Sequence, residues 1–330
     1  MGHRPVFNHG WKGRSEVGRF GFVAKRLLQT IPMLFGIVLV VFLVLQITPG
    51  DPARQIAGLR ASEADLNEVR EDLGLNDPVF MQYGRYVGNV LQGDLGYSYK
   101  SKQPVTQIIA PRIVVTAWLL GFGVLFTLLI SIPVGVLAAV RKDKPTDHII
   151  RGLGLVGLSM PAFWTGVILL LLVALRFDFF PPGGFGESNW DHFRSILLPS
   201  LTLAIASSPF IIRGLRAAMI SVLESEYVST ARSIGVAGGR LVRKFVLRNA
   251  AGPGVTLLAI EVGYLLFGAV VIETTFALPG VGQGIVIAAR GRDLPTVQGY
   301  TLLFALVVVA VYLLSDIITA ILDPRVEIDS

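Results

Sequence analysis

The residue types that most often do chemistry are few in this chain, and none has the spacing of a known catalytic site. There are four histidines (His3, His9, His148 and His192) and no H-E-x-x-H pair that could hold a catalytic zinc. The absence of cysteine excludes disulfides, thiolate metal sites and a cysteine nucleophile. G-x-S-x-G and G-x-x-x-x-G-K-[ST] are absent too. We therefore expect neither an intramembrane enzyme nor an ATPase site, and no metal bound by this chain.

One acidic residue stands inside a long apolar run. Glu261 lies in IEVGYLLFG, where an ionised side chain is costly and therefore informative. It has two interpretations: a contact in a translocation path for a cationic group such as a peptide amino terminus, or a carboxyl bonded to a neighbouring helix. The second is favoured, because isolated buried acids often become neutral. Glu273 and Asp316 lie near the ends of apolar runs, where we expect water to reach them and where they would fix helix ends.

A polar, arginine-rich segment, EYVSTARSIGVAGGRLVRKFVLRNA, separates two of the apolar runs. Its spacing predicts a short helix that ends near Ser233, with Tyr227, Ala231 and Ile234 on one face. Gly235 is expected to cap this helix with a positive φ angle. A small apolar face of this kind fits a groove on another protein. The alternative is a solvated loop whose arginines only set membrane topology.

The composition is that of a membrane protein. Of the 330 residues, 52% are apolar and 16% are charged, and the mean hydropathy is +0.63. Soluble domains carry about 25% charged residues. Runs of roughly 18 or more apolar residues are long enough to cross a bilayer as helices. Six such spans are predicted, at 27–47, 113–140, 152–175, 196–212, 254–274 and 297–322.

The distribution of Lys and Arg predicts the orientation. With the N-terminal tail (1–26) in the cytoplasm, the four inner segments carry six, four, seven and one basic residues along the chain. The two shorter outer loops hold four between them, and short loops weigh most in the positive-inside rule. Both termini, including the tail 323–330, and the loop 213–250 are therefore expected inside. The net charge of +6 is explained by this topology and needs no nucleic acid partner.

The segment 48–112 is the one sizeable region expected outside the cytoplasm. ASEADLNEVREDLGL predicts a helix with Ser62 as N-cap and Gly74 as its stop, and Pro78 stands near the start of a second helix. Because the segment is short, we expect a helical insertion that packs on the mouths of the spans.

The arginine-rich segment resembles the cytoplasmic loop of ABC importer permeases that fits into the ATPase subunit. EYVSTARSIG is similar to the E-Y-x-x-T-A-R-x-x-G form of the peptide/nickel subfamily, with Ala231 and Gly235 on the subfamily's alanine and glycine. Eight other motifs resemble that subfamily in order along the chain. They are TPGDP, LGLNDP, QY at Gln82–Tyr83, GDLGYS, SMPAFW, LLPSLTL, E-x-x-F-x-x-PGVG and SDIITAILDPRV. TPGDP and the long first outer segment resemble the first of the two paired permeases.

The resemblance implies an all-α polytopic protein with the type I permease fold and six transmembrane helices, of which 113–322 forms the five-helix core. It implies half of the pore of an ATP-driven importer in a bacterial inner membrane. The implied partners are a second permease subunit, two ATP-binding subunits that hold ATP and Mg, an extracytoplasmic substrate-binding protein, and lipid.

The resemblance also implies roles for residues. The coupling helix that docks on the ATPase would use Glu226, Tyr227, Thr230, Ala231, Ser233 and Gly235. Tyr227 would anchor the coupling helix in the ATPase, while the small residues Ala231 and Gly235 would let the ATPase approach the helix closely. Pro279, Gly280 and Gly282 of the ALPGVG loop, with the 48–112 insertion, would contact the binding protein or form the outer gate. The alternative for the ALPGVG loop and for the 48–112 insertion is a lid that only packs on the helix ends.

Two matters stay open at this level. A secondary transporter or channel without ATPase coupling also needs only six spans, although no inverted pair of broken helices is visible. The subfamily's solutes include di- and oligopeptides, glutathione, nickel chelates, opines and oligosaccharides. Peptide is expected only because it is the commonest, and no row of His or Met favours a metal.

Overall fold

The structure is a computed structural model that describes residues 11–47, 52–57, 61–72, 74–98, 100–236 and 238–322. The first ten residues, nearly all of the TPGDP motif and the tail 323–330 lie outside the described residues.

The described residues form helices and one small hairpin. The first half contains α1 (Trp11–Ile47), α2 (Pro52–Ala57), α3 (Glu63–Asp72), α4 (Val79–Leu91), β1 (Tyr97–Ser98), β2 (Gln103–Pro104), α5 (Val105–Val140), α6 (Pro145–Ser159), α7 (Ala162–Leu169) and the π-helical η1 (Leu170–Ala174). The second half contains α8 (Asn189–Leu223), α9 (Glu226–Ser233), α10 (Gly238–Leu241), the π-helical η2 (Val242–Leu247), α11 (Arg248–Thr275), α12 (Val281–Arg290) and α13 (Leu294–Leu322).

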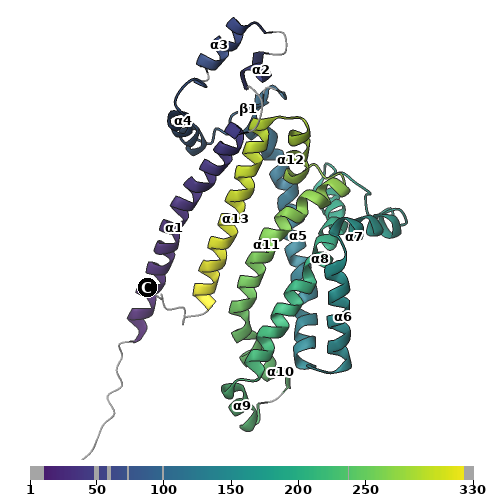
Figure 1. Cartoon of the computed structure of the whole chain (residues 1–330). Coiled ribbons are helices and arrows are strands. Elements are labelled where there is room, and N and C mark those ends of the chain that lie inside the picture. The colour runs from purple at the N-terminus through teal and green to yellow at the C-terminus, as the bar shows by residue number, and fades with distance from the viewer. Residues whose placement is uncertain are drawn as a thin grey trace, which may run out of the picture.

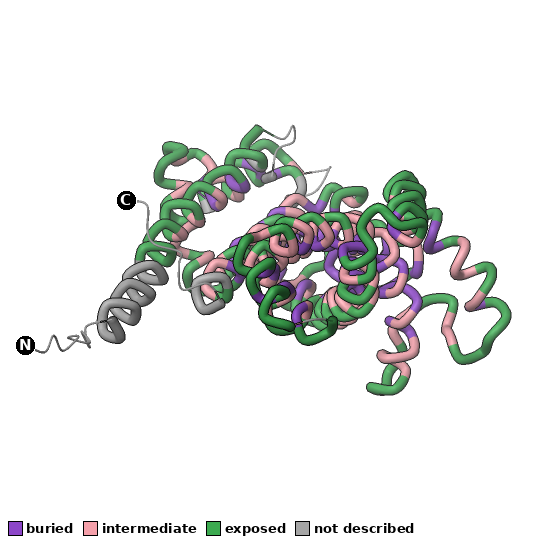
Figure 2. The backbone as a smooth tube through the Cα atoms, turned by 90° about the horizontal axis from the view of Figure 1, so that it is seen from below, coloured by how far each residue is buried: buried purple, intermediate pink, exposed green. Residues whose placement is uncertain are grey.

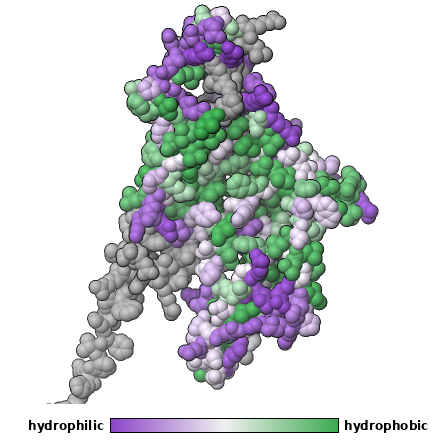
Figure 3. Space-filling model, viewed as in Figure 1, coloured by the Kyte–Doolittle hydropathy of each residue, from purple (hydrophilic) through white to green (hydrophobic). Residues whose placement is uncertain are grey.

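The predicted all-α fold is confirmed. Among the described residues, five helical segments are long and apolar enough to cross a membrane, and the number reaches the predicted six if the bent pair of α6 with α7–η1 is one span. Figure 3 shows an apolar belt between two hydrophilic ends. In Figure 1, α9 and α10 lie at the same end as the start of α1 and the end of α13, whereas α2, α3, α4 and α12 lie at the other.

The third predicted span, 152–175, is not one straight helix. It is bent by 97° between Ser159 and Ala162. Pro161 stands at the break as N-cap of α7, with a ψ of 136°, and the preceding Met160 is also extended. The residue before a proline is pushed out of the helical region, so the helix ends there. Pro161 thus breaks this helix completely.

The first span begins earlier than expected and lies at the edge of the molecule. Its helix starts at Trp11, so residues 11–26 are helical although they show no apolar periodicity. Figures 1 and 2 show α1 beside α13, away from the central helices. Of its described side chains, Val38, Val41 and Phe42 are buried. The ring of Phe42 packs against Tyr83 and Tyr86 of α4.

The insertion between the first two spans contains the expected helices and an unexpected hairpin. Ser62 and Asp65 form the reciprocal N-cap of α3, with Asp65 N–H to Ser62 Oγ at 3.3 Å and Ser62 N–H to Asp65 Oδ2 at 2.9 Å. Gly74 follows α3 with a φ of +60°, so both capping predictions are confirmed. The strands β1 and β2 pair antiparallel, and the Ser98 hydroxyl donates to Asp293 Oδ2 (2.5 Å) in the turn before α13.

The core is built where α5, α8 and α11 pack together (Figure 1). Its buried residues include Leu119, Ile196, Leu203, Ala269 and Ile272. Small residues let the helices approach closely, because a Cβ added at Gly135 would lie 3.1 Å from a Leu215 methyl. The core thus fixes the direction in which α8 and α11 leave the membrane toward α9.

Candidate functional site

The helix α9 is delimited by local backbone signals. Ser225 is extended at its N-cap, with φ −72° and ψ 150°, and Glu226 places a negative charge in the first turn, where the helix dipole favours it. At the other end Gly235 has a φ of +88°. Gly235 N–H donates to the Arg232 carbonyl and Val236 N–H to the Ala231 carbonyl, both at 3.0 Å. This pair of bonds is the Schellman motif, so the positive-φ cap predicted at Gly235 is confirmed.

One face of α9 is packed against its own chain. Val228 is fully buried and Ala231 is 4% exposed, and together with Leu241 of α10 they form a small apolar cluster. Leu241 and its neighbours occupy the side of Ala231, so this packing does not favour the close approach of a partner there, which stays a prediction. Ala231 holds α9 on the returning helix, and we call Val228, Ala231 and Leu241 the seat of α9.

The adjacent face of α9 is open. Tyr227 is 45% exposed and Ile234 is 76% exposed. Thr230 lies between them at helical spacing and is exposed, with its hydroxyl bonded to the Glu226 carbonyl at 2.9 Å. Glu226 and Ser233 are exposed beside this stripe. We call Tyr227, Thr230 and Ile234 the α9 stripe.

We expect Gly235→Ala to loosen α9 by about 1 kcal/mol, because a Cβ is disfavoured at a φ of +88°. No atom lies within 4 Å of the added Cβ, so the cost is one of backbone conformation. Gly239→Ala is the matched control, since that site is equally open and has no positive φ. Amide hydrogen exchange of α9 should speed up in the first variant and not in the second. Equal exchange in both would contradict the capping role.

Ion pairs tie the loop before α6 to the helix that leads into α9. Lys142 Nζ lies 2.5 Å from Glu224 Oε1, and this hydrogen bond raises the pKa of the Lys142 amine. Deeper, the carboxylate of Asp147 is fully buried and accepts from Arg216 Nε at 2.7 Å and Nη2 at 2.6 Å. Asp143 N–H donates to the same carboxylate at 3.0 Å. The end of α8 is therefore fixed to α6, next to α9.

Glu261 lies between helices. Its side chain is 7% exposed and lies beside Ser207 of α8. Nearby, Ser131 Oγ of α5 donates to the Ser208 carbonyl at 3.4 Å. This arrangement favours the interpretation as a carboxyl bonded to a neighbouring helix. A contact of Glu261 with a passing solute stays a prediction.

Glu273 organises the opposite end of the molecule. It is fully buried, so the expectation that water reaches it is wrong. Its carboxylate accepts from the Thr116 hydroxyl at 2.6 Å and from Gln283 N–H at 2.9 Å, in the first turn of α12. Val281 N–H donates to Thr116 Oγ1 at 2.9 Å. Glu273 thus fixes helix ends as expected, by capping a helix that the sequence did not predict.

The glycines of the ALPGVG loop serve this buried cap. Both Gly280 and Gly282 are buried. A Cβ at Gly280 would overlap the Glu273 carboxylate, and one at Gly282 would lie 2.5 Å from Val270 Cα. This packing favours the alternative of packed helix ends for Gly280 and Gly282, and their role in an outer gate or a binding-protein contact stays a prediction. Only Pro279 of the three is exposed.

Sequence reasoning missed Asp147, Arg216 and Thr116. A sequence signal for Asp147 was available: it is an acidic residue in a basic loop, two residues after Pro145, and proline is common where a helix starts. Thr116 carries no local signal, because its partner Glu273 is 157 residues away. No group of three or more His, Cys, Asp or Glu that could hold a metal occurs among the residues that the structure describes.

Comparison with known families places the chain. The family "Binding-protein-dependent transport system inner membrane component" matches residues 131–328, and the N-terminal model of the same kind of membrane component matches residues 19–120. The glutathione transport system permease protein GsiC of Pectobacterium atrosepticum is 38% identical over 306 residues, which cover 93% of this chain and 98% of that protein. GsiC of Escherichia coli strain K12 is 36% identical over the same lengths.

Solved structures share the fold. A chain of the inward-facing MetNI methionine ABC transporter matches 66% of this chain and 97% of its own length, with a TM-score of 0.56 and 17% identity. A chain of an amino acid ABC transporter crystallised with histidines matches 65% and 94%, with a TM-score of 0.51 and 16% identity. At these identities the likeness concerns the fold alone, and it confirms the predicted permease fold.

Proposed function

Because the chain belongs to the family of binding-protein-dependent transport system inner membrane components, we propose that it forms half of an importer pore that an ATPase moves through the α9 stripe. It is a permease subunit of an ABC importer and carries no ATPase domain of its own. Its family thus favours ATPase coupling over a free-standing secondary transporter or channel.

The observation that carries this proposal is the contrast between the two faces of α9. The seat fixes the helix to α10, while Tyr227 and Ile234 expose apolar surface next to it. An exposed isoleucine at the water-facing end of a membrane protein buries its side chain favourably when it enters a groove. The stripe therefore binds the ATP-binding subunit, and Glu226 and Ser233 flank the contact.

The seat also transmits the motion. Val222, at the end of α8, and Phe245, in η2, pack on the same cluster as Val228. When ATP closes two ATPase subunits, a displacement of α9 is passed to α8 and α11 as a rigid unit, because well-packed clusters do not deform continuously. The spans then exchange between inward-open and outward-open states.

The docking proposal is tested by cross-linking in the importer co-expressed with its ATP-binding subunits. Since the natural chain has no cysteine, Ile234→Cys introduces a unique thiol. We expect a reagent that couples to the thiol at one end and carries a photoreactive group at the other to link Ile234→Cys to the ATPase. Phe80→Cys on α4 at the other end, 70% exposed, should not be linked. If the thiol of Ile234→Cys reacts freely with a water-soluble maleimide in the ATPase-bound complex, docking at the stripe is ruled out.

The solute proposed is a peptide-like molecule, in line with the glutathione permeases that the chain resembles. The chain would act as the first of two paired permeases in a bacterial inner membrane, with both termini and α9 in the cytoplasm. A substrate-binding protein would deliver the solute at the α12 end, where Pro279 is exposed. Uptake of labelled glutathione, with dipeptides and an oligosaccharide as competitors, tests the solute class.

A further inference from the structure

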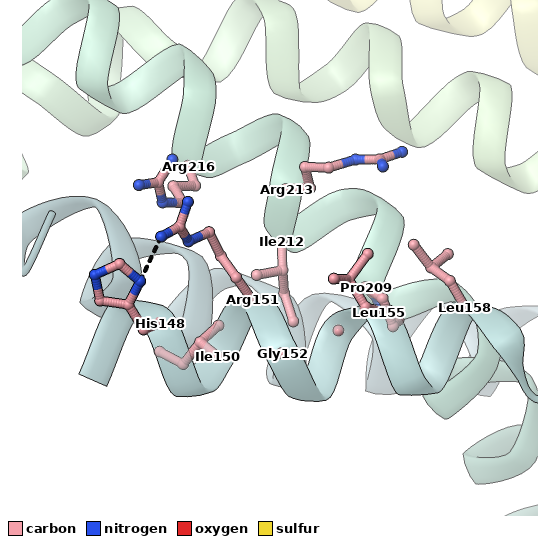
Figure 4. A pocket seen from close by; sticks show the side chains of 11 residues that line it. His148, Ile150, Arg151, Gly152, Leu155, Leu158, Pro209, Ile212, Arg213 and Arg216 are labelled. Atoms are coloured by element: carbon pink, nitrogen blue, oxygen red, sulfur yellow. Dashed lines mark hydrogen bonds between the residues drawn. The ribbon is translucent and has the colours of Figure 1, made fainter. Parts of the chain in front are cut away.

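A cavity of about 390 Å³ lies between α6 and α8, near the end of the molecule that carries α9. Figure 4 shows Leu155 and Leu158 of α6 and Pro209 of α8 along one part of it. Gly152 and Gly154 leave the α6 side open, and no heavy atom lies within 4 Å of a Cβ built on Gly152. The cavity is thus an apolar groove at the depth of the spans.

The same cavity is strongly cationic. His148, Arg151 and Arg216 gather at one end in Figure 4, and Arg213 lines the cavity from α8. Asp147 is the acidic group that faces them, and its two oxygens are occupied by Arg216. Arg151 Nε is 3.9 Å from Asp147, and its Nη2 lies 2.6 Å from His148 Nδ1. The Asp147 carboxylate thus faces two guanidinium groups, those of Arg216 and Arg151.

Arg213 stands apart from this group. It is exposed, and no ion pair or hydrogen bond of its side chain is found within the described part of the chain. Arg213 lies one helical turn after Pro209 on α8, at the start of the segment 213–250 that is expected in the cytoplasm. A guanidinium in this position is attracted to anionic lipid headgroups. The cavity therefore offers a cationic group and an apolar groove side by side, which suits a ligand that has both an anionic group and an apolar chain.

We propose that this cavity binds an anionic phospholipid. The phosphate accepts hydrogen bonds from Arg213, which lies on the same side of the cavity as Leu158 and Pro209 in Figure 4. An acyl chain lies along Leu155, Leu158 and Pro209. Basic pockets between transmembrane helices on the cytoplasmic side bind lipid headgroups by this combination of charge and apolar surface. The outer side of α6 is apolar as well, since Leu153 and Val156 are 67% and 57% exposed.

The apolar lining also distinguishes a lipid from a peptide-like solute. Leu155, Leu158, Pro209 and Ile212 offer no side-chain hydrogen bond to peptide groups, and unpaired peptide groups are costly in such surroundings. An acyl chain has no such requirement. The proposal does not depend on which solute the importer carries.

Phospholipid retention by the purified full-length chain tests the proposal. The chain is reconstituted into nanodiscs of phosphatidylglycerol and phosphatidylcholine, extracted into detergent, and its bound lipids are counted by native mass spectrometry. We expect phosphatidylglycerol to be retained in preference to phosphatidylcholine. Arg213→Gln should lower that retention about fivefold, the effect of one basic residue near an anionic lipid. Gly152→Leu should abolish it by filling the groove.

Two matched controls distinguish an effect at this cavity from the general effect of removing an arginine or of adding a leucine side chain. Arg243→Gln removes an exposed arginine of η2, and Gly121→Leu adds a side chain at an equally open site of α5. Both should retain phosphatidylglycerol as the parent does. Equal retention of the two lipids, or unchanged retention in Arg213→Gln and Gly152→Leu, would overturn the proposal. Displacement of the lipid by glutathione would overturn it too and assign the cavity to the solute path.

Discussion

Replacement of Glu273 by alanine is expected to destabilise the protein by about 3–5 kcal/mol, because it removes the acceptor of buried donors on two other helices. The Thr116 hydroxyl and the Gln283 amide would both lose their partner, at 2.6 and 2.9 Å in the native structure. The side chain is fully buried, so water does not replace it without opening the site. Unfolding in a mixed-detergent titration, followed by circular dichroism, measures the effect.

A second variant approaches the same cap from the opposite side. Gly282→Ala places a Cβ 2.5 Å from Val270 Cα, a backbone atom that cannot rotate away. We expect it to displace the start of α12 and to weaken the cap as Glu273→Ala does. Glu68→Ala, which removes an exposed carboxylate from α3, is the control and should change stability by less than about 0.5 kcal/mol. If the stability of Glu273→Ala equals that of Glu68→Ala, the Glu273 cap does not stabilise the α12 end of the molecule.

Removal of Asp147 is the second change with a large expected effect. Asp147→Ala leaves the Arg216 guanidinium beside α6 without its bidentate partner, and deprives the Asp143 amide of its acceptor. We expect a loss of about 3 kcal/mol, at the lower end for buried pairs because the Arg216 side chain is 17% exposed. Because the pair fixes to α6 the end of α8 that leads into α9, ATP-driven uptake should fall together with stability.

The double variant Asp147→Leu with Arg216→Met separates an unpaired charge from lost packing. Replacing a buried pair by apolar residues of similar volume is often neutral, so the double variant should recover most of the stability lost in Asp147→Ala. The exposed pair of Lys142 and Glu224 provides a contrast. Its removal by Glu224→Ala should leave the unfolding midpoint nearly unchanged. If the double variant is no more stable than Asp147→Ala, packing rather than charge explains the loss.

Much of the architecture follows from local signals. Long apolar runs predict the spans because a bilayer leaves no solvent for free backbone groups, so each run must form a helix. The cap at Gly235 and the Ser62–Asp65 cap of α3 are equally local, since each is completed within a few residues. The family motifs are local as well, because each is a short run of residues, so the sequence alone was enough to identify the permease family.

The tertiary structure decided which face of each element is covered. Helical spacing put Tyr227, Ala231 and Ile234 on one side of α9, but the return of the chain through Leu241 buried Ala231 and left the other two open. Likewise α12 and its buried cap exist because Glu273 and Thr116, far apart in sequence, meet across α11 and α5. Burial depends on which helices become neighbours, and spacing within one helix contains no information about its neighbour.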